Sequence, residues 1–245
     1  MRKGRMIFLA LSILLVLAGC GNGEPQESGT SNPGSASHEA SSPSEGNPSA
    51  AAPDNTAQGG DSNILIAYFS RVGNTDFPDD IDAVSSASLL RKDGELFGNT
   101  QYIASLIQQA TDGDLFLIET AEKYPVDYDE TDALGQKENR ERSRPALASH
   151  VDNLDDYDRI FLGFPNWYYD MPMAVYAFLE EYDLSGKTII PFVTSGGSGF
   201  SKAVSAIQSI QPNAEVLADG YKVTHSKVDG VTLADIQEWL DGLDG

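Results

Sequence analysis

The stretch "NILIAYFSRVGNT", residues 63–75, decides the fold of this chain. Residues 63–70 form a continuous apolar run, which is typical of a strand buried on both faces of a sheet. The run then turns polar, and its glycine, amide and hydroxyl residues predict a turn at the strand end. The tripeptide Gly-Asn-Thr recurs at residues 98–100, where a helical pattern follows directly. The repeat raises the question of which copy contacts a ligand.

Apolar runs and helical patterns alternate along the rest of the chain. Further strands are predicted in residues 114–120, 158–165, 187–195 and 214–223. Apolar residues at helical spacing predict helices in residues 101–110, 175–182, 201–210 and 232–243, and residues 129–143 form a polar helix at most. Continuously apolar strands separated by helices predict an α/β fold, a doubly wound five-stranded parallel sheet with helices on both faces.

The N-terminal segment, residues 1–20, is predicted to be a lipoprotein signal peptide. It has a basic start, a short apolar core and the only cysteine of the chain, Cys20. The apolar core is too short for a comfortable membrane span. The sequence "LAGC", residues 17–20, resembles the lipobox of bacterial lipoproteins, which implies lipidation of Cys20. We therefore expect an extracytoplasmic lipoprotein held at the membrane by its lipid anchor only; an ordinary signal peptide with a chance cysteine is the alternative.

Residues 21–60 and 61–245 differ sharply in composition. The first segment is rich in Gly, Ser, Pro, Asn and Glu and predicts a disordered linker, whereas the second is long enough for one domain. The whole chain has a net charge of −21. Without the three basic residues of the signal peptide and the five acidic residues of the linker, residues 61–245 carry −19. So acidic a domain argues against nucleic acid as a partner.

The loops after the first, third and fourth strands are the candidate ligand contacts, because doubly wound sheets bind ligands beyond the carboxyl ends of their strands. The first loop, "SRVGNT" (70–75), has the hydroxyl, amide and glycine residues that suit a phosphate; a polar turn without a ligand is the alternative. No Gly-x-Gly-x-x-Gly fingerprint and no P-loop lysine follows this strand. NAD and nucleoside triphosphates are therefore poor candidates.

The other two loops suit a flat ring. In "GFPNWYYDMP" (163–172), Trp167 can cover a ring by stacking. The alternative for these aromatic residues is either core packing or a dimer contact. We favour this alternative for Tyr169 and ring stacking for Trp167. In "TSGGSGF" (194–200), glycines allow close approach, and hydroxyl and N–H groups can bond a ring; a flexible turn is the alternative.

Together "AYFSRVGNT", "FLGFPNWYYDMP" and "PFVTSGGSG" resemble the flavodoxin family, in the same order along the chain. The resemblance implies a flavodoxin-like strand order 2-1-3-4-5 and non-covalently bound FMN. It implies a phosphate loop of Ser70, Arg71, Asn74 and Thr75, ring contacts from Pro165, Asn166, Trp167 and Tyr168, and a third loop of Thr194, Ser195, Gly196 and Gly197.

One departure from the family pattern answers the opening question. Residues 76–98 separate the first Gly-Asn-Thr from the helix that the second copy begins. We predict a split phosphate site, with Ser70 and Arg71 on the strand side and Asn99 and Thr100 at the helix start, where N–H groups favour an anion. In the rival interpretation the first copy binds and the second only caps the helix.

The resemblance implies electron transfer to a redox partner protein or to a small electron acceptor such as a quinone. The flavin carries the redox chemistry, so no catalytic side chain and no metal is predicted. His150 and His225 are predicted to be surface residues, whereas Tyr124 and Tyr128 could wall the substrate side of the flavin. A flavodoxin-fold interaction module that has lost FMN is the alternative.

The predicted anchor can be tested by replacing Cys20. The variant Cys20→Ser lacks the thiol that accepts lipid, so it should incorporate no labelled lipid and should leave the membrane fraction or accumulate unprocessed. Lipid labelling and cell fractionation measure this. If both proteins fractionate alike and neither takes up label, the lipoprotein prediction is wrong.

Overall fold

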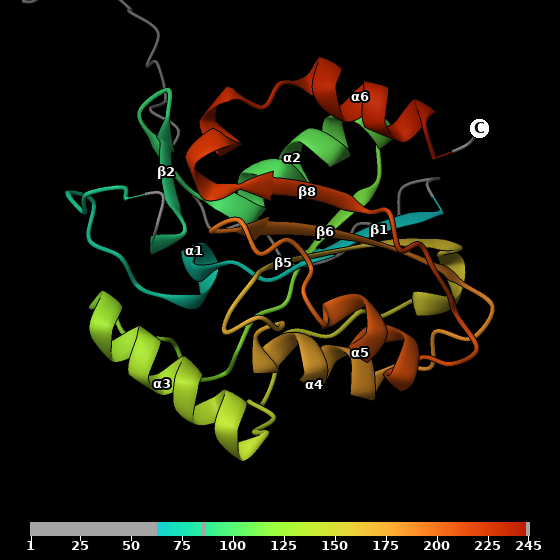
Figure 1. Cartoon of the computed structure of the whole chain (residues 1–245), viewed down its shortest axis with the longest axis horizontal. Helices are drawn as coiled ribbons and strands as arrows, with labels where there is room; N and C mark the ends of the chain where they lie inside the picture. The colour runs from blue at the N-terminus through green and yellow to red at the C-terminus, as the bar shows by residue number, and fades with distance from the viewer. Residues whose placement is uncertain (1–62, 85–86, 244–245) are drawn as a thin grey trace, which may run out of the picture. The chain divides into compact units, whose positions relative to one another are not determined.

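The computed structural model describes residues 63–84 and 87–243, so the predicted signal peptide, its Cys20 and the linker lie outside the described residues. A six-stranded sheet runs through the domain in the order β4-β1-β5-β6-β7, with β8 also pairing β6. All its pairs are parallel. The predicted α/β fold and strand order are confirmed, with the fifth strand present as two segments, β7 and β8 (Figure 1).

The elements follow the alternation seen in the sequence. The strands of the sheet are β1 (Ile64–Tyr68), β4 (Asp114–Leu117), β5 (Arg159–Pro165), β6 (Thr188–Ser195), β7 (Glu215–Val216) and β8 (Tyr221–Thr224). The helices are α1 (Arg71–Asn74), α2 (Asn99–Thr111), α3 (Tyr128–Glu141), α4 (Met173–Glu181), α5 (Ala203–Ile210) and α6 (Leu233–Asp241). Two 3-10 helices, η2 (Leu154–Asp156) and η3 (His225–Gly230), and a separate antiparallel hairpin, β2 (Leu89–Lys92) with β3 (Glu95–Gly98), complete the described chain.

Both faces of the sheet are buried, which explains the continuous apolar strands. Leu65 and Ala67 of β1 belong to one apolar cluster, with residues of α4 and α5. Ile66 and Tyr68 belong to the other, with residues of α2 and α6. The two pairs of helices lie on opposite sides of the sheet (Figure 1). Because successive side chains of a strand point to opposite faces, every position of β1 must be apolar.

The edge strand is interrupted opposite Pro191. β7 pairs β6 at Thr188 and Ile189, and β8 resumes the pairing at Phe192. Between them the chain approaches β6 so closely that a Cβ on Gly220 would lie 1.9 Å from the Pro191 carbonyl oxygen. Proline has no N–H to donate to a sheet partner, so the ladder breaks where it stands.

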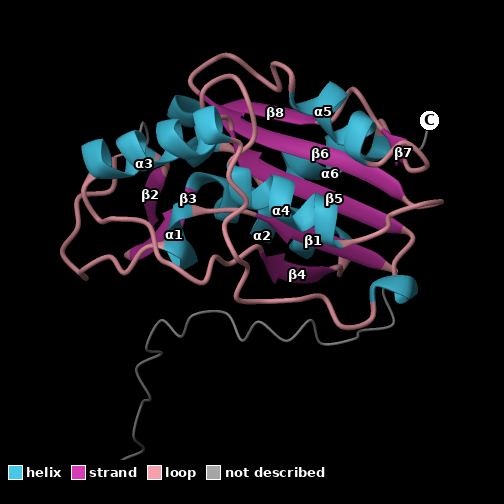
Figure 2. Cartoon of the chain, turned by 90° about the horizontal axis from the view of Figure 1, so that it is seen from below, coloured by secondary structure: helices cyan, strands magenta, loops and turns pink. Residues whose placement is uncertain are grey.

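The predicted polar helix, α3, forms, but it does not cover the sheet. It lies beyond the carboxyl ends of the strands, at the same end of the domain as α1 and the hairpin (Figure 2). The chain after it returns along β4, where Ala121 N donates to Ala146 O and Ala148 N to Glu119 O. This return segment supplies the buried side chains of Val151 and Tyr157 to the core. A helix without an apolar face is thereby left free to line the strand ends.

Two tyrosine hydroxyls attach α3 to the rest of the domain. Tyr168 Oη donates to Asp132 Oδ1 at 2.8 Å, and Tyr124 Oη donates to Glu138 Oε2 at 3.0 Å. Burial raises the pKa of the Glu138 carboxyl, although the bond from Tyr124 opposes the shift. The folded state therefore holds this proton more tightly than the unfolded state does. Its contribution to stability is complete below the unfolded-state pKa and is lost as pH rises through the folded-state pKa.

Glu138→Gln removes the ionisation and keeps an oxygen that can accept from Tyr124. At pH 7 this variant should be more stable than the wild type, by less than about 1 kcal/mol because the site is partly exposed. Near pH 4 the advantage should vanish. Urea unfolding at both pH values measures the difference, with Glu141→Gln on the exposed side of the same helix as control. An advantage that does not change with pH would contradict the assignment.

Candidate functional site

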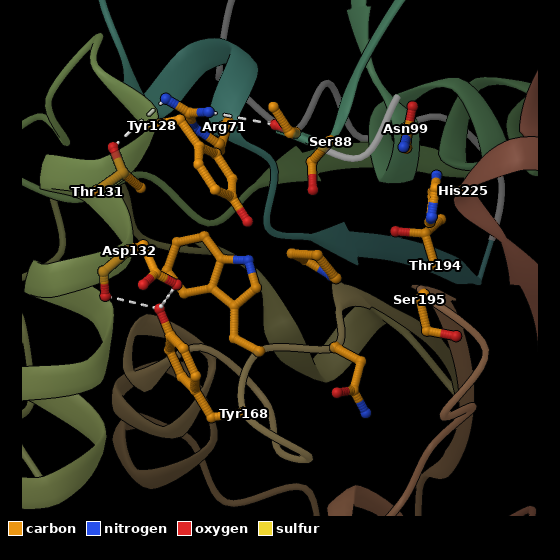
Figure 3. Close-up of a pocket in the computed structure, with 15 residues that line it drawn as sticks. Arg71, Ser88, Asn99, Tyr128, Thr131, Asp132, Tyr168, Thr194, Ser195 and His225 are labelled. Atoms are coloured by element: carbon orange, nitrogen blue, oxygen red, sulfur yellow. Dashed lines mark hydrogen bonds between the residues drawn. The ribbon is translucent and has the colours of Figure 1, made fainter. Parts of the chain in front are cut away.

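A pocket of about 270 Å³ opens at the carboxyl ends of the strands. Three polar loops, after β1, β5 and β6, reach it together with the start of α2, the start of α3 and the start of η3 (Figure 3). Its lining residues are Arg71, Ala87, Ser88, Asn99, Tyr128, Thr131, Asp132, Pro165, Asn166, Trp167, Tyr168, Thr194, Ser195, Gly196 and His225. Nine of the predicted site residues line this cavity, whereas five do not: Ser70, Asn74, Thr75, Thr100 and Gly197.

The first Gly-Asn-Thr copy is used mainly inside the protein. Asn74 is fully buried, and its amide nitrogen donates to Ser70 O at 2.9 Å and Ile118 O at 3.0 Å. Its amide oxygen accepts from Thr120 N at 2.8 Å and Thr120 Oγ1 at 3.0 Å. With all its hydrogen-bonding positions occupied, this side chain ties the loop after β1 to the segment after β4. The Asn74 side chain, predicted for the phosphate loop, therefore does not reach the pocket.

The second copy adjoins the first half of the predicted phosphate site. A Cβ built on Gly98, the residue before α2, would lie 1.8 Å from Ser70 Oγ. From there Asn99 begins α2 and lines the pocket. Thr100 is 1% exposed, and its Oγ1 lies 3.0 Å from Thr194 Oγ1 at the end of β6. The structure thus brings Ser70, the start of α2 and the third loop together, as the split arrangement predicts.

Two buried hydroxyls in the first loop have no hydrogen-bond partner within the described protein. They are Ser70 Oγ and Thr75 Oγ1, in side chains that are 2% and 6% exposed. A buried hydroxyl without a partner costs free energy, so each needs an acceptor or donor from outside the protein. Neither side chain lines the pocket, and Ser70 Oγ lies beside Gly98, the residue before α2. The phosphate oxygens predicted for this loop are acceptors of the required kind.

Arg71 lines the pocket, but its terminal nitrogens are directed at the protein. Nη1 donates to Ala87 O at 3.2 Å, and Nη2 donates to Pro125 O at 3.2 Å and Val126 O at 3.1 Å. Burial lowers the pKa of the guanidinium, and the nearby Tyr128 and Asp127 oppose this effect. Arg71 therefore joins the inserted segment to the approach of α3, and only its buried Nε has no partner in the described protein.

The loop after β5 is a tight turn held by a buried carboxylate. Trp167 N donates to Asp170 O at 2.9 Å and Asp170 N donates back at 3.0 Å, while Tyr168 and Tyr169 between them have φ of 56° and 61°. Asp170 itself is fully buried, accepts from Tyr176 Oη at 2.9 Å, and has Lys202 Nζ 3.1 Å away. These bonds stabilise a left-handed backbone that bulky residues otherwise avoid.

Trp167 is fixed by edge contacts at the pocket wall. Its ring centroid lies 5.4 Å from Phe69 and 5.5 Å from Tyr124, with interplanar angles of 82° and 83°. Tyr128, which also lines the pocket, is 51% exposed. Tyr169 is 72% exposed, which contradicts core packing and leaves the dimer contact as the expectation for this residue. A rigid indole edge is suited to hold a flat ring in one plane.

The loop after β6 is ordered by its own serine and by the neighbouring loop. Ser195 Oγ accepts from Gly197 N at 3.2 Å and Gly199 N at 3.1 Å, and Asn166 Nδ2 donates to Gly199 O at 2.8 Å. The φ of Gly197 is +118°, a conformation that a side chain would strain. Thr194, Ser195 and Gly196 line the pocket, whereas Gly197 shapes the loop without lining it.

Six lining residues lie outside the predicted site. Ala87 and Ser88 come from the inserted segment, Thr131 and Asp132 from α3, and His225 from η3. Tyr128, predicted only to wall a substrate side, is the sixth, while its companion Tyr124 is buried. His225, expected at the surface, is half-buried and lines the pocket, because it directly follows β8 at the strand ends. No local pattern in the sequence marks these positions, since a small insertion and a polar helix have no fixed position relative to a sheet.

Other kinds of site receive no support from the described residues. Within residues 63–84 and 87–243 there is no group of three or more His, Cys, Asp or Glu side chains that could hold a metal ion. Among the helices of that same part of the chain, none is long and apolar enough to cross a membrane.

The fold and pocket define a class, the flavoproteins with a doubly wound sheet, and the comparisons with known proteins agree. The crystal structure of a protein assigned as a flavoprotein from Bacteroides uniformis ATCC 8492 is 28% identical, with a TM-score of 0.54, over 74% of this chain and 98% of that one. One from Bacteroides eggerthii DSM 20697 is 26% identical, with a TM-score of 0.55 and the same coverage. No curated protein sequence matches.

The family model described as Flavodoxin matches residues 94–243. This match spans more than half of the chain, and the chain belongs to the flavodoxin family. The membership confirms the resemblance seen in the three loops and supports FMN as the cofactor. The match begins at the inserted hairpin, just before the second Gly-Asn-Thr copy.

Gly98 should be essential for bringing the two halves of the site together. In Gly98→Ala the new methyl group would displace Ser70 Oγ from its present rotamer, so the free energy of unfolding should fall by about 0.5–1.5 kcal/mol. Gly230→Ala is the matched control, because no atom lies within 4 Å of a Cβ there. Denaturant unfolding of both variants measures this, and equal stability would contradict the close approach.

Proposed function

We propose that the domain binds FMN non-covalently and acts as an electron-transfer flavoprotein outside the cytoplasm. The observation that carries the proposal is the meeting, in one pocket, of three polar loops and a helix start that are far apart in the sequence. Each loop alone is compatible with an ordinary turn. A phosphate at one end and a flat ring at the other explain all of them together.

The residues present fit the phosphate. Ser70 Oγ is buried without a partner and faces the start of α2, whose first N–H groups have no acceptor within the helix. The 13 residues of α2 orient their dipoles so that this end attracts an anion. Ser70, Asn99 and Thr100 would hold the phosphate between them. Asn74 would act only as the buried support of the loop.

The residues of the other two loops fit the flavin ring. Trp167 offers an indole held by Phe69 and Tyr124, and Thr194 to Gly196 offer hydroxyl and N–H groups. FMN supplies the redox chemistry when bound, and the protein orients it and sets its surroundings. In a domain of charge −19, added negative charge on the flavin is electrostatically disfavoured, so reduction potentials should be low.

The electron acceptor would reach the pocket beside α3. Tyr128 at its rim is 51% exposed, so a small planar electrophile such as a quinone, or the surface of a redox partner protein, can approach there. Export and attachment through Cys20 form part of the same proposal and rest on the sequence "LAGC". The alternative is an interaction module that keeps this fold without FMN.

Purification of the protein tests the proposal directly. A yellow protein that releases FMN on denaturation supports flavin binding, whereas a colourless protein that cannot be loaded with FMN favours the interaction module. If the loaded protein is reduced directly by NADH or NADPH and reoxidised by quinones, it is an enzyme. If it is reduced only by another protein, it is a carrier.

Trp167 should contribute to binding of the ring. Trp167→Ala should weaken FMN by about 1–3 kcal/mol, the scale of a buried aromatic contact, and should weaken riboflavin equally because the ring is the same. It should also change the quenching of flavin fluorescence. The other tryptophan, Trp239, is a residue of α6 that packs against Phe161 of the sheet, and its replacement serves as the control. Unchanged affinity and quenching in Trp167→Ala would assign it a structural role.

The split phosphate site predicts a difference between FMN and riboflavin, which lacks the phosphate. Ser70→Ala and Thr100→Ala should each weaken FMN by roughly 1.5–3 kcal/mol, the value of a hydrogen bond to a charged group, and should leave riboflavin nearly unchanged. Thr75→Ala should have the smaller effect. Titration of all three variants with both ligands measures this. If Thr75→Ala abolishes FMN binding and Thr100→Ala only lowers Tm, the first copy holds the phosphate and the second is a helix cap.

A further inference from the structure

The segment after β8 brings a histidine to the pocket. Thr224 is the last residue of β8 and lies beside Ser195 in the register with β6. His225 follows it as the first residue of η3, at the level of the third loop. Its ring lies at the end of the pocket where Asn99 and Thr194 lie (Figure 3). This is the end at which α2 begins.

The position of His225 is fixed by its neighbours in the chain. Val228 of η3 is fully buried in the same cluster as the side chains of α2 and α6. Tyr102 Oη of α2 donates to Val231 O at 3.0 Å, just beyond η3. Lys92 Nζ of the hairpin donates to Asp229 O at 2.8 Å. Contacts on three sides thus hold the short helix that carries the imidazole.

A basic side chain near a bound phosphate would offset part of the negative charge of so acidic a domain. Of the described residues that line the pocket, Arg71 and His225 are the two basic ones. The Arg71 terminal nitrogens are directed at the carbonyl oxygens of Ala87 and of the segment before α3. Of these two basic residues, His225 is the one that lies at the end of the pocket where α2 begins (Figure 3).

A second observation places an anion at this end independently of the histidine. Ser70 Oγ is buried, has no partner in the described protein, and points at Gly98, the residue that precedes α2. At this helix start Asn99 N donates to Ser88 O at 2.9 Å, so the donors on this side are the Ser70 hydroxyl and the N–H groups that follow Asn99 in the first turn of α2. The imidazole of His225 lies at the same end of the pocket, where it can donate an N–H to an oxygen that these groups leave uncovered.

We propose that His225 completes the phosphate subsite by donating an imidazole N–H to the phosphate of FMN. The inference rests on the proposed FMN binding and extends it to a residue outside the three loops. It makes η3 a specificity element, which selects the phosphorylated flavin over riboflavin. His225 would contribute little to binding of the ring itself.

The test compares the dissociation constants for FMN and riboflavin across four proteins: wild type, His225→Ala, His225→Gln and His150→Ala. His150 is the matched control, because its ring is exposed and lies beside Glu181, remote from the pocket lining. His225→Ala should weaken FMN by about tenfold or more, the loss of one charged hydrogen bond, with riboflavin changed less than about twofold. His225→Gln retains an N–H donor and should recover part of the loss.

Riboflavin affinity also reports whether each variant is folded. If wild type binds FMN and His225→Ala keeps the same ratio of FMN to riboflavin affinity, the inference is overturned while FMN binding stands. Equal losses for both ligands in His225→Ala and His225→Gln would assign His225 to the ring or to the fold and would also overturn it. If the wild type binds neither ligand, the proposed function fails first, and the two failures remain distinguishable.

Discussion

The close approach of Gly98 to Ser70 is the constraint on which the site depends. The inserted segment leaves the sheet after β1 and must return so that α2 can start beside the strand end it left. Glycine lets Ser70 Oγ occupy this place, since a Cβ would lie 1.8 Å from that oxygen and would displace it. Once that contact is made, α2 packs on the sheet, Thr100 meets Thr194, and the loops after β1 and β6 face one cavity.

The two copies of Gly-Asn-Thr carry the same amide and hydroxyl groups but use them in different ways. In the first copy Asn74 uses its whole amide to bind two segments of the protein together. In the second, Asn99 is directed to the pocket because the helix begins there. The same tripeptide therefore ties two segments together at one place and begins a helix beside the pocket at the other, because different segments surround the two copies.

Because α3 lies beyond the strand ends and not on a face of the sheet, it forms one wall of the pocket. Its residues are too polar to cover an apolar sheet, and the return segment with Val151 and Tyr157 covers the core in its place. Tyr168 and Tyr124 then bond α3 to the strand ends, where Thr131 and Asp132 line the cavity. The wall beside Trp167 is thus a polar helix with a half-exposed tyrosine, which suits contact with an electron acceptor.

The sequence by itself determined the sheet, because strands buried on both faces are continuously apolar along their buried length, as in residues 64–69, 160–165 and 189–193. It also determined the three loops, since glycine, hydroxyl and aromatic residues at strand ends are local signals. Only the tertiary structure decided where α3 lies, that Asn74 is used internally, and that His225 reaches the pocket. Those outcomes depend on contacts between segments far apart in the chain, such as Tyr168 with Asp132 and Thr224 with Ser195, for which no local periodicity exists.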